Sequence, residues 1–339
     1  MTKEQINSLI SAGKFPESDE HRELIETHIS WVILGDEIVY KIKKPVYYSF
    51  LDFSSVERRK HFCEREIELN KRFTKRIYLD VQPVSEWRGR LYVGINKGAI
   101  IDYAVRMNKI DREKQMNVLL LKNGVTEFDI LKLAEKIALF HRNTDIIYEG
   151  NSLDIQEKFN DLNSEEQFLR ENLGAQMGSI ITQAAGTSDI FIRNNKNLLT
   201  ERLSQGYFRD CHGDLHSRNI FLLPEPNPFD CLEFNDQLRQ IDVLNEVAFL
   251  CMDLDAFDRK DLSTSFIEYY DQFFPSMRSN AEHRLFVYYK SYRANIRAKV
   301  NSLRAKSAMD ITEKTKALTA AKKYLLLLKN YIDSVAALA

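Results

Sequence analysis

The feature that most constrains the fold is a change in residue pattern close to residue 104. Before it, short runs of β-branched and aromatic residues surround one polar helix, in the order strand, strand, helix, strand, strand, strand. After it, most apolar residues recur at the three- and four-residue steps of helices. This order predicts an α+β fold with two lobes. We expect a small antiparallel-sheet lobe over 1–104, with a helical start, and a larger, mostly helical lobe over 105–339.

Local patterns place the individual elements. Residues 1–25 are expected to form one or two short helices, and Gly35-Asp36 predicts the turn of a β-hairpin over 29–43. The other expected elements are a helix over 54–73, strands over 78–84, 90–95 and 99–107, a helix over 128–142, and a strand-like island over 207–234. The island contains the catalytic-type motif described below.

Composition excludes several classes of protein. The chain has 12 glycines in 339 residues, about half of the usual ~7%, and their spacing gives neither a Rossmann fingerprint nor a P-loop. A net charge of −1 argues against general nucleic-acid binding. The sequence has no long apolar run and no signal-peptide pattern, so we expect no membrane span and a cytoplasmic protein with four reduced core cysteines.

The densest group of reactive side chains is His212–Asn219, with the sequence HGDLHSRN. Asp214 and Asn219 stand five positions apart, the interval between the catalytic Asp and the Mg²⁺-binding Asn in kinases. A carboxylate can orient an acceptor hydroxyl and take its proton. Gly213 permits a sharp turn, His212 is expected to brace the loop from the core, and His216 is expected to face a cleft or solvent.

This motif and its surroundings resemble a known family. HGDLHSRN is similar to the H-G-D-x-x-x-x-N loop of aminoglycoside phosphotransferases and choline kinases, which share the bilobal protein-kinase-like fold. With ETHISWV, VYKIKKPV and CLEFND, the pattern most resembles an uncharacterised bacterial branch of that family. Some members of the branch carry a further C-terminal P-loop domain, which the glycine spacing leads us not to expect here.

The resemblance implies the roles of three residues. Asp214 would be the catalytic carboxylate, and Asn219 would bind Mg²⁺. In the family, a hairpin follows this Asn and leads to an acid that also binds Mg²⁺. Glu233, 14 residues beyond Asn219, takes that place, with Asp230 as its rival. Alternation along a strand would point these two acids to opposite faces.

The resemblance also implies a nucleotide site in the N-terminal lobe. Lys41 ends the second strand, where the phosphate-binding lysine of a kinase lies, and Glu66 lies on the helix that supplies its partner. Lys43 is the rival lysine, because alternation places it on the same strand face. Glu64 and Glu68 are the rivals of Glu66.

Two further sites follow from the same comparison. Asp242 is expected to be structural and to hold the catalytic loop through backbone hydrogen bonds. The turn at Thr27–Ser30, where the family has a glycine-rich loop, contains no glycine pair. The Thr27 and Ser30 hydroxyls could substitute for it.

Two other charged groups lie outside the motif. Lys290, Arg293 and Arg297 recur at helical spacing and form either a solvated face or, for Arg293 and Arg297, a site for an anionic substrate. Asp253, Asp255, Asp258 and Asp261 are expected at a solvated helix end.

The resemblance therefore implies an ATP- and Mg²⁺-dependent phosphotransferase acting on a hydroxyl of a small molecule. The alternatives are a nucleotide-binding regulatory pseudokinase and, with no D-F-G to A-P-E activation segment, the less favoured protein Ser/Thr kinase. The sequence predicts no nucleic-acid or membrane partner, and it leaves the acceptor and the oligomeric state open.

Overall fold

The structure, a computed structural model, describes residues 1–19, 21–48 and 51–337, and the chain forms two compact units. Unit 1 comprises Met1–Asn123 and Arg218–Arg239, and unit 2 comprises Gly124–Ser217 and Gln240–Ala339. Unit 1 holds a large antiparallel sheet, whereas unit 2 is mostly helical. The predicted α+β class is confirmed, and the lobe boundary at residue 104 stays a prediction.

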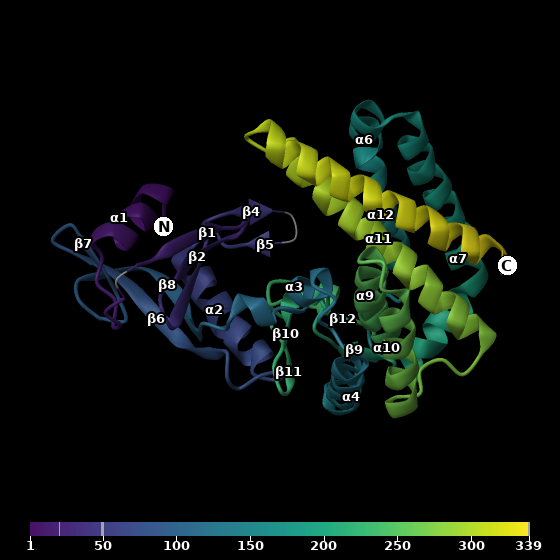
Figure 1. The fold of residues 1–339 in the computed structure, drawn as a ribbon, viewed down its shortest axis with the longest axis horizontal. Helices are drawn as coiled ribbons and strands as arrows, with labels where there is room; N and C mark the ends of the chain where they lie inside the picture. Colours follow the sequence, from purple (N-terminus) through teal and green to yellow (C-terminus); the bar gives the residue numbers. More distant parts are fainter. Residues whose placement is uncertain (20, 49–50, 338–339) are drawn as a thin grey trace. The chain divides into compact units, whose positions relative to one another are not determined.

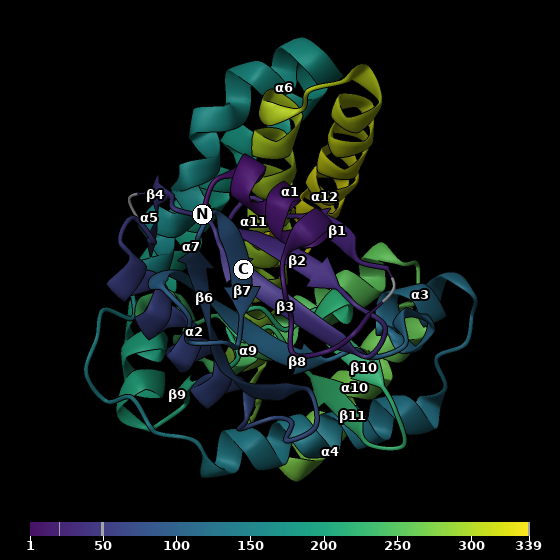
Figure 2. The ribbon, with the colours of Figure 1, turned by 90° about the vertical axis from the view of Figure 1, so that its left-hand side faces the viewer.

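Unit 1 is built on a six-stranded antiparallel sheet with the strand order β1-β2-β3-β8-β6-β7 (Figures 1 and 2). Its strands are β1 (Glu23–Glu26), β2 (Ser30–Leu34), β3 (Ile38–Lys43), β6 (Tyr78–Trp87), β7 (Arg90–Val93) and β8 (Ala99–Asn108). The unit also contains α1 (Lys3–Ala12), β4 (Tyr47–Tyr48), β5 (Leu51–Asp52), α2 (Val56–Asn70), η1 (Arg112–Lys114), α3 (Met116–Leu121), β10 (Ile220–Leu222), β11 (Pro226–Pro228) and α8 (Asp236–Arg239). The helix η3 (Ser217–Asn219) spans the junction of the units.

Strand alternation gives the sheet two buried faces. Tyr40 and Ile42 of β3 lie in a core with residues of α1, whereas Val39 lies in a second core with Cys63 and Ile67 of α2. Because successive side chains on a strand point to opposite faces, Lys41 and Lys43 share the face of Val39. The lysines of β3 therefore point to the face that α2 covers.

Most predicted elements of unit 1 are confirmed, including the hairpin, which forms β2 and β3. The Ser55 hydroxyl accepts a hydrogen bond from Arg58 N and caps α2. One expectation is wrong, because the second part of residues 1–25 contains strand β1 rather than a helix. Pairing with β2 decides this: four residues of β1 complete a ladder whose local sequence, Glu-Leu-Ile-Glu, has no strong preference.

Unit 2 surrounds a central helix, α9 (Val243–Ala256), in which every residue is buried. It packs against α10 (Lys260–Phe273) and α11 (Asn280–Ser307), and α11 lies beside α12 (Ile311–Ala337) as a long antiparallel pair (Figure 1). The other elements are α4 (Glu127–Asn143), α5 (Ile155–Asn160), η2 (Asp161–Glu165), α6 (Glu166–Leu173), α7 (Ala175–Ser204), β9 (Phe208–Asp210) and β12 (Gln240–Asp242).

Burial corrects one expectation and confirms another. Asp258 and Asp261 are exposed, as expected. Asp253 and Asp255 are instead buried in α9, where Asp255 pairs with Lys290 and accepts a hydrogen bond from the Tyr331 hydroxyl. All four cysteines are buried thiols, as predicted.

Within the described part of the chain, every helix is too short or too polar to cross a bilayer.

Candidate functional site

Two lysines and three carboxylates meet on the α2 side of the sheet in unit 1. Lys41 Nζ lies 2.8 Å from Glu66 Oε1 and 2.6 Å from Asp230 Oδ1. Lys43 Nζ lies 2.7 Å from Glu66 Oε2 and also binds Glu233. Glu66 therefore bridges both lysines, and each lysine holds one acid of the segment that follows β11. We call these five residues the lysine–carboxylate cluster.

The side chains of the cluster differ in their exposure to solvent. The side chains of Lys43, Glu66 and Glu233 are at most 5% exposed, whereas that of Asp230 is 43% exposed. Burial alone would raise the pKa of Glu66, but the charges of Lys41 and Lys43 outweigh it and lower this pKa to about 2. Burial raises the pKa of Glu233. Glu66 thus stays ionised between the two ammonium groups.

The segment after β11 is tied to the sheet and to α2 by backbone hydrogen bonds. Asp230 N donates to the Tyr78 hydroxyl at 3.0 Å, and Cys231 N donates to Asn70 Oδ1 at 2.9 Å. Asp230 has a φ of 60°, so the chain leaves extended geometry there. The expectation that Asp230 and Glu233 point to opposite faces is therefore wrong, because no strand continues through them and both reach the lysines of β3.

Asn219 and Asp230 stand at the same end of a two-stranded hairpin. Strands β10 and β11 pair with Ile220 opposite Pro228, and Phe229 N donates to Asn219 O at 2.9 Å. The ladder therefore brings Asn219 beside the residue that precedes Asp230. The buried amide and the accessible carboxylate flank one end of β10–β11 within unit 1.

The backbone of the loop that carries Asp214 is hydrogen-bonded to a buried glutamate of α9, Glu246. The carboxylate of Glu246 accepts hydrogen bonds from His212 N at 2.7 Å and from Gly213 N at 3.1 Å. Burial raises the pKa of Glu246 to about 7, against the opposing effects of Arg293 and of these two N–H donors. Gly213 has a φ of 85°, the left-handed conformation that glycine adopts without strain.

Asp214 itself lies near three basic side chains, those of His212, His216 and Arg297. His216 Nε2 is 3.4 Å from Asp214 Oδ2, and Asp214 N donates to His212 Nδ1 at 3.3 Å. The Asp214 side chain is 40% exposed. Its partial burial raises its pKa, but His216, Arg297 and His212 outweigh this effect and hold the pKa well below its ordinary value. His212 braces the loop as predicted. The expectation that His216 faces solvent is wrong, because it is buried and its ring packs on Phe249. The alternative that it faces a cleft stays a prediction.

Solved structures with this architecture cover nearly the whole chain. The choline kinase of Cryptosporidium parvum Iowa II superposes with a TM-score of 0.55 at 12% identity, over 98% of this chain and 97% of the kinase. A choline/ethanolamine kinase family protein of Mesorhizobium loti gives a TM-score of 0.51 at 10% identity, over 97% of this chain and 100% of that protein. The chain has the choline kinase fold.

Sequence comparison gives relatives of greater length. No protein-family model matches the sequence. Uncharacterised proteins of Mycobacterium tuberculosis and Mycobacterium bovis are 32% identical over 287 residues, covering 82% of this chain and 54% of each relative. The chain thus spans about half the length of the curated relatives it matches.

The alternatives on β3 and α2 can now be placed within the choline kinase fold. Glu66 is fully buried and binds both lysines, whereas Glu64 and Glu68 are exposed on the opposite side of α2. Lys41 is more exposed than Lys43, at 13% against 1%. The structure brings together both rival lysines and both rival acids, so the assignment of roles depends on their accessibility.

The basic residues of α11 do not form a solvated face. Arg293 is buried, and its guanidinium donates to Asn245 O, to Asn245 Oδ1 at 2.7 Å and to Gly213 O at 3.4 Å. Arg297, one turn later, is half-buried. Arg293 therefore supports the catalytic-type loop from one side while Glu246 supports it from another.

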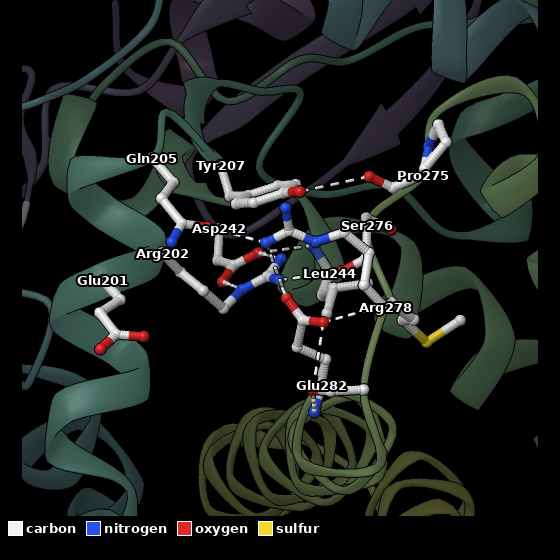
Figure 3. Close-up of polar contacts among 12 residues, drawn as sticks. Glu201, Arg202, Gln205, Tyr207, Asp242, Leu244, Pro275, Ser276, Arg278 and Glu282 are labelled. Carbon is white, nitrogen blue, oxygen red and sulfur yellow. Dashed lines mark hydrogen bonds and ion pairs between the residues drawn. The ribbon is translucent and has the colours of Figure 1, made fainter.

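Asp242 has a different structural role from the one predicted. It caps α9 by accepting from Leu244 N at 2.9 Å, and it binds the guanidinium of Arg202 at 2.6 and 2.8 Å (Figure 3). Arg202 also pairs with Glu282, at the start of α11. Glu246, rather than Asp242, holds the loop backbone. Sequence reasoning missed the role of Glu246, because the apolar run Val-Ala-Phe-Leu after it indicates a buried helix but not what the carboxylate binds.

The turn between β1 and β2 is closed by its own hydroxyl groups. Thr27 Oγ1 accepts from Ser30 N at 2.9 Å and lies 2.8 Å from Ser30 Oγ. Thr27 N also donates to Ser30 O at 2.9 Å. The turn is therefore tight without glycine, and its two hydroxyls bond to each other.

Proposed function

We propose that this chain is a phosphotransferase that moves the terminal phosphoryl group of ATP, with Mg²⁺, onto a hydroxyl of a small molecule. The observation that carries this proposal is the lysine–carboxylate cluster beside the Asn219–Asp230 hairpin end. A β3 lysine paired with a helix glutamate, together with an Asn and an Asp for metal ions, is the set of groups that kinases use on ATP.

The oxygen donors of unit 1 fit a magnesium ion. Mg²⁺ prefers carboxylate and amide oxygens and is often held by one or two protein groups together with phosphates and water. Asn219 and Asp230 offer such a pair, and the cluster has three carboxylates for two lysines. Among the described residues, no three His, Cys, Asp or Glu side chains are arranged to hold a metal ion by themselves. A Mg²⁺ ion here would therefore depend on Asn219, Asp230 and the phosphates of ATP together. When bound, Mg²⁺ would neutralise charge on the phosphates.

Accessibility supports Asp230 as the principal carboxylate ligand. Its side chain is 43% exposed, whereas Glu233 is 5% exposed and binds Lys43. The sequence-based assignment of Glu233 stays a prediction, and we propose Asp230 in its place. By the same reasoning we propose Lys41 for the α/β-phosphates and Lys43 as a buried support for Glu66.

Asp214 is proposed to position the acceptor. Its lowered pKa keeps the carboxylate ionised near neutral pH, so it can accept a hydrogen bond from the acceptor hydroxyl. Glu246 and Arg293 hold the loop beneath it through His212 N, Gly213 N and Gly213 O. These contacts fix the orientation of the carboxylate before the acceptor binds.

The test is the turnover of Asp214→Asn. We expect a fall in phosphoryl transfer of about 10²- to 10⁴-fold with ATP affinity retained, because the amide cannot take the hydroxyl proton. Asp145→Asn, at an exposed position of unit 2, is the matched control and should behave as the wild type. Wild-type turnover in Asp214→Asn would refute the assignment.

A second candidate is a nucleotide-binding regulatory module that transfers no phosphate. The closed Thr27–Ser30 turn favours it, because hydroxyls bonded to each other offer fewer donors to phosphates than glycine backbone N–H groups. ATP binding without ADP release, across a broad set of alcohols, would support this candidate and exclude the first.

A further inference from the structure

Arg297 differs from Arg293 on the same helix because one of its guanidinium N–H groups, at Nε, has no hydrogen-bond acceptor. Arg293, one turn earlier on α11, uses its guanidinium on Asn245 and on the carbonyl of Gly213. Arg297 Cζ lies 5.4 Å from the ring centroid of Tyr324, and the Arg297 side chain forms a hydrogen bond with Tyr324, but its buried Nε has no hydrogen-bond partner. A buried guanidinium N–H without an acceptor costs free energy, so this donor is suited to a ligand oxygen.

The acidic groups of the same region already have partners. Glu246 accepts from His212 N and Gly213 N, and Asp253 accepts from Ser217 N at 2.9 Å and from the Ser217 hydroxyl. Asp214 pairs with His216. A cationic acceptor would have to compete with these contacts and would meet the positive charge of Arg297.

The pKa shifts of Asp214 and Arg297 agree with a positive charge close to Asp214. Arg297 is one of the groups that lower the pKa of Asp214, together with His216 and His212, and its guanidinium contributes positive potential at this carboxylate. The pKa of Arg297 is raised by Tyr324, Asp253 and Asp214 in spite of burial, which keeps its guanidinium charged.

We propose that the acceptor alcohol carries an anionic group, a carboxylate or a phosphate, and that Arg297 binds this group beside Asp214. The proposal rests on the phosphotransferase function proposed above. In that reaction the acceptor oxygen bonds to the γ-phosphorus of ATP and the bond to the β–γ bridging oxygen breaks. ADP leaves, and the hydroxyl proton passes to Asp214 and then to water.

The first experiment determines the charge of the acceptor. A small-molecule extract is separated by ion exchange into anionic, neutral and cationic fractions, and each is incubated with the protein, Mg²⁺ and ATP labelled in its γ-phosphate. We expect at least ten times more labelled product from the anionic fraction than from either of the others. Preferential labelling of the neutral or cationic fraction would overturn the inference.

Two variants then test the residue. Arg297→Gln should raise the KM for the anionic acceptor about 10- to 100-fold, the effect of losing a charge-assisted hydrogen bond, while the KM for ATP stays unchanged. Arg297→Lys should recover part of the loss. Arg304→Gln removes the same charge from an exposed position of α11 and is the matched control. An unchanged acceptor KM in Arg297→Gln would overturn the inference.

Measurements of anion binding can test the Arg297 site even if the proposed phosphotransferase function fails. If no fraction accepts phosphate although ATP binds, the phosphotransferase proposal fails, and D-glycerate, glycerol 3-phosphate and glycerol are tested by thermal denaturation. Stabilisation by one of the two anions, lost in Arg297→Gln but kept in Arg304→Gln, supports the anion site and shows which anion it takes. An equal response to glycerol, or no response to either anion, overturns it.

Discussion

At the scale of single residues, Lys43 shows how strongly the cluster depends on charge balance. Its side chain is 1% exposed, and its ammonium group lies between Glu66 and Glu233. Lys41 shares Glu66, but its other partner, Asp230, is accessible to water. Loss of Lys43 would therefore leave the buried Glu233 without its cation, whereas loss of Lys41 would leave the accessible Asp230 without its cation.

We expect Lys43→Met to lower the free energy of unfolding by about 3–5 kcal/mol, because it leaves buried carboxylate charge without its cation. Lys41→Met should cost less, since water can solvate Asp230. Urea denaturation of both variants measures the difference. Equal losses would contradict the distinction drawn between the two lysines.

A second residue-scale prediction concerns pH. Burial raises the pKa of Glu246 from 4.5 to about 7, so the folded protein binds this proton more tightly than the unfolded chain. The contribution of Glu246 to stability is therefore fully present below about pH 4.5 and is lost as the pH rises to about 7, by on the order of 3 kcal/mol.

Glu246→Gln keeps an acceptor for His212 N and Gly213 N but does not ionise. Its stability should therefore be flatter than that of the wild type between pH 5 and about 7, as measured by denaturant unfolding at each pH. Parallel profiles for the two proteins would show that Glu246 does not titrate in this range.

At the scale of elements, a buried charge network joins three helices of unit 2. Arg202 near the end of α7 binds Asp242, the N-cap of α9, and Glu282 in the first turn of α11 (Figure 3). All three side chains are at most 4% exposed. Negative charge at helix N-termini is favourable, and Arg202 balances the charge of the two carboxylates away from solvent.

We expect Arg202→Met to lower the free energy of unfolding by about 3–5 kcal/mol, because two buried carboxylates lose their cation. Arg278→Met is the control: Arg278 also contacts Glu282 but is 54% exposed, so its loss should cost about 0.2–1 kcal/mol. Chemical denaturation compares them. A loss under 1 kcal/mol for Arg202→Met would show that the network contributes little.

At the scale of the whole molecule, the fold and the cluster together predict a nucleotide response. A ligand that binds only the folded chain stabilises it by about 2.7 kcal/mol at a hundred times its Kd. ATP should therefore raise the melting temperature, and Mg²⁺ should increase this shift, because it neutralises the phosphates beside Asn219 and Asp230.

Thermal denaturation with ATP, in the presence and absence of Mg²⁺, measures this response. Asp230→Asn should remove most of the Mg²⁺-dependent part, whereas Glu233→Gln should retain it if Asp230 is the principal ligand. The reverse result would restore the sequence-based choice of Glu233. No shift at millimolar ATP would remove the nucleotide assignments of Lys41, Asn219 and both acids together.

Sequence patterns determined the local features of this protein. Alternation on β3 placed Lys41 and Lys43 on one face, and the Asp-x-x-x-x-Asn interval marked Asp214 and Asn219. These predictions succeed because strand alternation, capping and turn geometry depend on residues that are close in the chain. The short strand β1 was missed because its pairing with β2, rather than its own residues, makes it a strand.

Only the tertiary structure decided which charges meet. Lys41 and Asp230 are 189 positions apart in sequence, and no periodicity predicts that they touch. Likewise, Glu246 rather than Asp242 holds the catalytic-type loop, and Arg293 is buried. Ion pairs and pKa shifts depend on distance through space and on exclusion of water, and both are set only when distant segments have packed together.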